Sequence, residues 1–108
     1  TEAKRISEAQ GYTLDAGSLP GDYGYMGGDS DVFNMIKEAS VAGGYSKEGF
    51  DNTAGESVII AYKLDEQSKG GANVSLNIVV ENSNVLGAYL DIEGEPTVQP
   101  VSEKSVFE

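Results

Sequence analysis

Two acidic side chains stand two positions apart near the end of the chain, and a third follows at the same spacing. Asp91 and Glu93 belong to an alternating segment, so we expect their carboxyl groups on one strand face, about 7 Å apart. Paired carboxylates do general acid and base chemistry in glycosidases. The competing interpretation is a solvated face whose charges, with Glu95, discourage strand pairing. We favour this interpretation, because glycosidases build their carboxylate pair into a deep cleft on a larger scaffold.

A second acidic group, Asp29–Asp31, begins like a calcium-binding EF-hand loop. That loop needs an oxygen ligand at its fifth position, glycine at its sixth and glutamate at its twelfth. The chain has Phe33, Asn34 and Ser40 there, so we predict helix capping and no metal site. Gly27-Gly28 precedes this helix start, as in anion cradles, but the neighbouring carboxylates would repel a phosphate.

The best binding candidate is the glycine- and tyrosine-rich segment Gly17–Gly28, which we expect to form a packed loop. Tyrosine and methionine are enriched at interfaces, and further tyrosines expected at the surface would extend the patch. The predicted ligand-binding residues are Tyr23, Tyr25, Met26, Tyr45 and Tyr89. The alternative is that these side chains only cover one end of a sheet, and the sequence favours neither interpretation.

Composition excludes several classes of function. The 108 residues include no Cys and no His, which removes disulfides, thiolate nucleophiles, zinc fingers and the Ser-His-Asp triad. The formal net charge of −11 argues against direct nucleic-acid binding and against docking on anionic membranes. The longest apolar run, Val58–Tyr62, is too short to cross a bilayer. We therefore predict no cofactor, no nucleic-acid partner and no membrane insertion by this chain.

The expected secondary structure follows from the periodicity of the apolar residues. A helix is predicted over Asp29–Val41, ended by Gly43-Gly44, and a loop that Phe50 pins to the core is predicted over Tyr45–Ser57. The apolar stripe of the helix is Val32, Met35, Ile36 and Ala39. Strands are predicted over Gly11–Leu14, Ser57–Leu64, Asn73–Glu81, Val85–Glu93 and Thr97–Val101, the last at an edge beside Pro100. In the third and fourth of these, Asn77 and Tyr89 are expected on a solvated face.

Strands and helix are segregated along the chain, which predicts an α+β fold: an antiparallel sheet of roughly 4–5 strands with one helix packed on one face. Residues 11–101 would form this single domain, after a polar arm at 1–10 and before a polar tail at 102–108. The stretch Gly70–Asn82, GGANVSLNIVVEN, resembles the central strand of lipoproteins with the PsbP-like fold. The resemblance implies an α+β fold and an exported setting, and it assigns no functional residue.

These observations favour a non-enzymatic binding domain whose ligand is a protein or a glycan. Because the chain begins at Thr1 rather than Met, we expect a processed protein that is secreted or lipid-anchored at a bacterial cell envelope. An alternative is a small acidic intracellular inhibitor that mimics nucleic-acid charge and blocks a basic groove. A carboxylate-only enzyme built on Asp91 and Glu93 ranks third.

Overall fold

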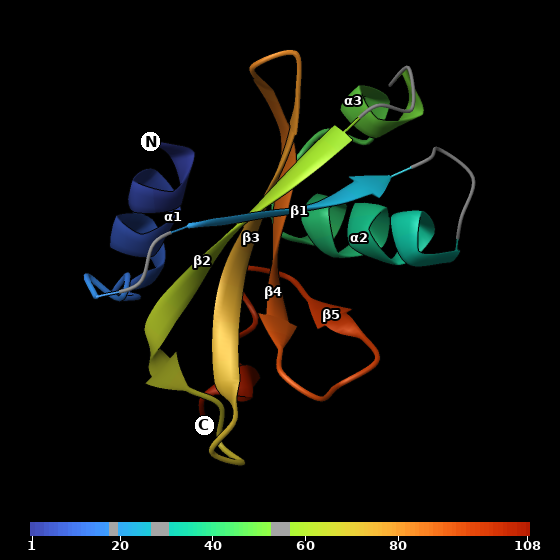
Figure 1. The fold of residues 1–108 in the computed structure, drawn as a ribbon. Coiled ribbons are helices and arrows are strands. Elements are labelled where there is room, and N and C mark those ends of the chain that lie inside the picture. Colours follow the sequence, from blue (N-terminus) through green and yellow to red (C-terminus); the bar gives the residue numbers. More distant parts are fainter. Residues whose placement is uncertain (18–19, 27–30, 53–56) are drawn as a thin grey trace.

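The computed structural model describes residues 1–17, 20–26, 31–52 and 57–108, with the backbone alone over 22–26. The fold is α+β, as predicted, and its sheet is antiparallel throughout with the order β1-β2-β3-β4-β5 (Figure 1). The strands are β1 (Gly21–Met26), β2 (Ser57–Gln67), β3 (Asn73–Glu81), β4 (Asn84–Ile92) and β5 (Val98–Gln99). The helices are α1 (Glu2–Gln10), α2 (Asp31–Ala42), α3 (Lys47–Asp51) and a 3-10 turn, η1 (Lys104–Val106).

The central hairpin is the part of the fold that the sequence predicted best. β3 has the predicted bounds, and β4 begins and ends one residue earlier than expected. Asn82 and Ser83 join the two strands with φ angles of 49° and 67°. Positive φ at both positions is typical of a two-residue hairpin turn that matches the twist of the strands.

One face of the sheet packs against α1. Buried side chains of the strands, including Leu64, Leu76 and Leu90, form a cluster with Ala3 and Ile6 of this helix. Residues expected to form a polar N-terminal arm thus contribute to the core. The C-terminal segment does the same, because Val106 is buried in this cluster and the ring centroid of Phe107 lies 5.1 Å from that of Tyr12.

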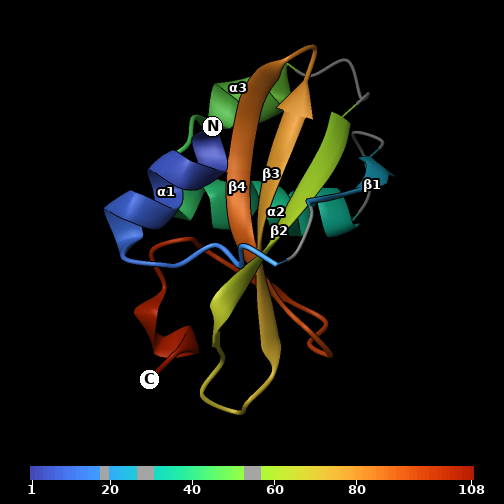
Figure 2. The same ribbon diagram turned by 60° about the vertical axis from the view of Figure 1, so that its left-hand side comes forward.

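The opposite face is covered by α2 and α3, and Figures 1 and 2 place α1 and α2 on opposite sides of the sheet. The second cluster consists of Phe33, Ile36, Ala39, Phe50, Ile59, Val79 and Tyr89. The expectation of a solvated face around Asn77 and Tyr89 was therefore wrong, since both residues are buried. β3 and β4 are the middle strands here, and helices cover them on both sides.

The buried stripe of α2 also differs from the predicted one. Phe33, Ile36, Ala39 and Ser40 point into the core, whereas Val32 is 54% exposed. Ile36 and Ala39 belong to both stripes. Where the stripes differ, the larger side chain of Phe33 is buried and Val32 is left at the surface. The hydroxyl of Ser40 donates a hydrogen bond of 3.1 Å to the carbonyl oxygen of Ala88.

Three predictions about loops and strands were wrong. One is the loop predicted over Tyr45–Ser57, which contains α3. The segment Gly17–Gly28, expected to be a loop, contains β1, which pairs with β2 and has a bulge between Tyr23 and Tyr25. The predicted strand Gly11–Leu14 is reduced to one bridge, between Leu14 and Leu64. The prediction that Phe50 anchors its segment was confirmed, because this side chain is buried where α3 meets the sheet.

Candidate functional site

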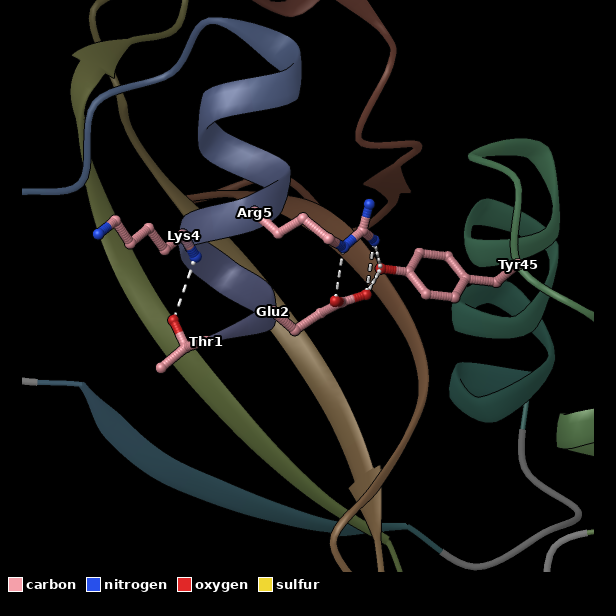
Figure 3. Close-up of polar contacts among 5 residues, drawn as sticks. All are labelled: Thr1, Glu2, Lys4, Arg5 and Tyr45. Atoms are coloured by element: carbon pink, nitrogen blue, oxygen red, sulfur yellow. Dashed lines mark hydrogen bonds and ion pairs between the residues drawn. The ribbon is translucent and has the colours of Figure 1, made fainter.

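Tyr45, one of the predicted binding residues, belongs to a polar network on α1 (Figure 3). Its phenol donates a hydrogen bond of 2.6 Å to Oε2 of Glu2. Arg5 donates two hydrogen bonds, of 2.8 and 2.7 Å, to the same carboxylate, and its Nη2 lies 3.5 Å from the phenol oxygen. The ring of Tyr45 also packs against the core cluster beneath α1. Tyr45 therefore ties the segment after α2 to the first turn of α1.

The electrostatics of this network favour the charged Glu2–Arg5 pair and a neutral phenol. Hydrogen bonds from Arg5 and Tyr45 outweigh burial and lower the pKa of Glu2 from 4.5 to about 2. Burial and the hydrogen bond to Glu2 raise the pKa of the Tyr45 phenol above its ordinary value of 10.0. A phenol held in this state is a structural hydrogen-bond donor, and it is not poised for proton transfer near neutral pH.

Tyr89 has a different structural role on the other side of the sheet. It is 3% exposed, and its hydroxyl accepts a hydrogen bond of 3.1 Å from Nδ2 of the buried Asn77. Tyr45 packs in the cluster beneath α1 and Tyr89 in the cluster beneath α2, so the structure does not bring them together. The structure places Tyr23, Tyr25 and Met26 in β1, and their side chains lie outside the described part of the chain.

The carboxylates Asp91 and Glu93 have different surroundings. Asp91 lies within β4, opposite Ser75 and Val98, and burial raises the pKa of its half-buried carboxyl group. Glu93 follows the last residue of β4, and its Oε2 accepts a hydrogen bond of 3.3 Å from Nδ2 of Asn73. The amide of Glu93 donates a hydrogen bond of 2.9 Å to the carbonyl oxygen of Asn73, so the pairing with β3 continues one residue beyond β4. Glu93 lines the hollow described next and Asp91 does not.

A concave site lies at the end of the sheet, in a hollow of about 390 Å³ that we call the end cleft. It is enclosed by the β2–β3 loop, the end of β4 with the turn after it, β5 and η1. In Figure 1 these segments meet at the lower end of the sheet. Four stretches that are separate in sequence thus surround one site, which only the tertiary fold could assemble.

Backbone hydrogen bonds hold the walls of the end cleft in place. The amide of Lys69 donates to the carbonyl oxygen of Val106 at 2.8 Å and joins the β2–β3 loop to η1. Within this loop, the amide of Gly71 donates to the carbonyl oxygen of Ser68 at 2.8 Å, and the amide of Ala72 donates to the Ser68 hydroxyl at 3.1 Å. The cleft is therefore largely preformed, which reduces the ordering cost of binding.

The lining of the end cleft combines apolar and charged groups. Ile92 and Val106 are buried side chains that supply an apolar surface, together with the half-buried Ala72. Lys69, Glu93 and Glu95 supply the charges, and Gln99, Ser68 and Ser105 supply further hydrogen-bonding groups. Such a mixture can bind and orient a ligand. Sequence reasoning singled out Glu93 and Glu95 for other reasons, but it missed Lys69 and Gln99, and the turn signal at Gly70-Gly71 was the only local hint.

The described residues support neither a metal site nor a membrane-spanning helix. Among these residues, no group of three or more carboxylates, His or Cys comes together that could hold a metal ion. The cluster Asp29–Asp31 lies mostly outside the described part of the chain, and its last member, Asp31, begins α2 as an exposed residue. The helices that the structure describes are too short and too polar to span a membrane.

Comparison with known proteins gives no match. Neither the family models, nor the curated proteins, nor the solved structures contain a significant relative of this chain.

Proposed function

We propose that this protein is a non-enzymatic binding domain that holds a protein or glycan ligand in the end cleft. The single observation that carries the proposal is the end cleft itself, a hollow of about 390 Å³ with an apolar surface, a charged rim and hydrogen-bonded walls. Its volume falls within the range of roughly 300–1,000 Å³ that is usual for ligand sites.

A binding role is favoured over catalysis by the chemistry of the chain. The sequence offers neither His nor Cys, and the two carboxylates that could have acted together, Asp91 and Glu93, do not line the same cleft. Asp91 is partly buried next to β5, while Glu93 is engaged by Asn73. The rim groups of the end cleft can hold a ligand through hydrogen bonds and ion pairs.

An exported setting, at the cell envelope or outside the cell, is part of the proposal. It rests on the sequence alone, and the gene sequence upstream of Thr1 tests it. A basic start followed by an apolar stretch and a cleavage site would support export. An initiating Met directly before Thr1 would contradict it.

The binding site is tested by blocking the end cleft with one substitution. We would screen the labelled protein against arrays of glycans and of peptides, in parallel with Glu95→Trp and Glu38→Trp. Glu95 lines the cleft and Glu38 is exposed on α2, so the two variants lose the same charge and gain the same ring. Any ligand of the wild-type protein should lose at least about tenfold in affinity for Glu95→Trp only. Equal affinities for all three proteins would overturn the assignment of the site.

The acidic-inhibitor alternative rests on the net charge of −11 and makes a different prediction. If a partner binds through the overall negative charge, Glu95→Gln and Glu38→Gln should lower its affinity by similar amounts. Added salt should lower this affinity steeply. A partner of the end cleft should be weakened by Glu95→Gln alone. The two functions are therefore separable with one pair of charge variants.

A further inference from the structure

We propose that the end cleft accepts the basic side chain, lysine or arginine, of a partner protein. The inference rests on the proposed function and specifies the chemistry of the ligand. It starts from the cavity and its mixed lining, in which an apolar surface lies beneath a rim that carries more negative than positive charge.

The first argument is the charge of the rim. Glu93 and Glu95 line the cleft together with one cationic residue, Lys69, so the rim keeps an excess of one negative charge. The ion pairs seen among the described residues use Glu2, Asp15 and Asp51, so neither cleft carboxylate is neutralised by one of them. A cationic side chain of the partner would balance this negative charge and form a charge-assisted hydrogen bond with a rim carboxylate.

The second argument is the apolar surface beneath the rim. Ala72, Ile92 and Val106 come from three different segments and meet in the cleft. Lysine and arginine bury their methylene stems against apolar surface while the charged head stays at a polar rim. The apolar surface of the cleft therefore fits the methylene stem of such a side chain, and the acidic rim fits its charged head.

The third argument distinguishes a protein ligand from a glycan. Sugar rings commonly stack on aromatic side chains in carbohydrate sites, and the described residues that line the end cleft include no aromatic one. The net charge of −11 also attracts a basic partner over distance and disfavours a second copy of the same chain. A basic protein segment is therefore the ligand that fits the cleft best.

The experiment uses three capped tripeptides that differ only in the middle residue: lysine, arginine, or norleucine, which keeps the stem without the charge. Backbone amide shifts over residues 68–72 and 92–95 are followed by NMR during titration. We expect the lysine or arginine peptide to bind at least about fivefold more tightly than the norleucine peptide. The double variant Glu93→Gln/Glu95→Gln should remove this difference, and Glu38→Gln should preserve it. The amide spectra of the variants themselves verify that they remain folded.

The outcomes separate this inference from the function on which it rests. Equal binding of the norleucine and basic peptides, or an unchanged preference in the double variant, would overturn the basic ligand class. If a glycan or an acidic peptide shifts the same amides and the basic peptides do not, the ligand class is wrong but the binding cleft stands. If no probe shifts these amides and Glu95→Trp leaves every array ligand bound, the proposed function itself fails.

Discussion

The phenol of Tyr45 donates a hydrogen bond of 2.6 Å to the carboxylate of Glu2, which lies 43 positions earlier in the chain. This contact connects the segment after α2 with the first turn of α1, although the two helices cover opposite faces of the sheet (Figure 3). Tyr45, which was predicted from the sequence to bind a ligand, thus connects two elements of the fold by a hydrogen bond. Because Glu2 is ionisable, the contribution of this network to the stability of the fold depends on pH.

Acid should weaken the fold through Glu2. The pKa of this group is about 2 in the folded protein against an ordinary value of 4.5. Because the folded value is the lower one, the ionised carboxylate stabilises the fold fully above pH 4.5, and this contribution is lost as the pH falls from there toward about 2. Glu2→Gln should therefore lose less stability than the wild-type protein on acidification across this range.

Urea midpoints measured at about pH 6 and about pH 3 give the change in unfolding free energy for each protein. Glu38→Gln serves as the control, since Glu38 is exposed on α2, and it should keep the wild-type dependence on pH. An identical acid dependence in Glu2→Gln and the wild-type protein would show that the network does not stabilise the fold.

Tyr89→Phe should destabilise the protein without changing the affinity of the end cleft. The substitution removes the hydroxyl that accepts from Nδ2 of Asn77 at 3.1 Å, inside the core. Removal of one partner from a buried hydrogen bond costs about 1–3 kcal/mol. Tyr62→Phe, at a half-buried position of β2, should cost less. Chemical denaturation compares the two variants, and loss of ligand affinity in a stable Tyr89→Phe protein would contradict the structural role.

Gly87→Ala should strongly destabilise the contact between β4 and the helices on the α2 side. A Cβ atom at Gly87 would lie 2.5 Å from Cζ of Phe50 and 2.5 Å from Oγ of Ser40. Both neighbours are fully buried, so the core must shift, at a cost of about 1–3 kcal/mol or more. The control is Gly49→Ala in α3, where the nearest neighbour of the new Cβ would be Cδ2 of Leu86 at 3.9 Å. Thermal unfolding should rank Gly87→Ala far below this control.

Ser83→Gly should stabilise the central hairpin. Ser83 has a φ of 67°, a conformation that costs an L-residue about 1 kcal/mol and that glycine adopts without this cost. We expect a gain of roughly 0.5–1 kcal/mol in the free energy of unfolding. Ser102→Gly, at an exposed turn where φ is not positive, should give no gain. A lower melting temperature for Ser83→Gly would contradict the turn geometry.

The strength of the local pattern explains which predictions succeeded. β3 was correct to the residue because its apolar side chains alternate with polar ones, with Val79 as the exception, and turn residues flank the segment. β1 was missed because its glycines resemble those of a loop, and only its pairing with β2 makes it a strand. The prediction for α2 chose Val32 in place of Phe33, because it followed the i, i+3, i+4, i+7 spacing and gave no weight to the larger area of the aromatic side chain.

The α+β class was predictable from the sequence, as were the central hairpin, the presence of α2 and the anchoring role of Phe50, since each depends on periodicity or on one large apolar side chain. Helices cover β3 and β4 on both faces and bury Asn77 and Tyr89, and this arrangement depends on contacts between elements that are distant in the chain. The end cleft likewise could not be predicted from the sequence. Lys69, Glu93, Gln99 and Val106 become neighbours only when the strands pair and η1 docks, because contacts between distant segments leave no periodic trace in the chain.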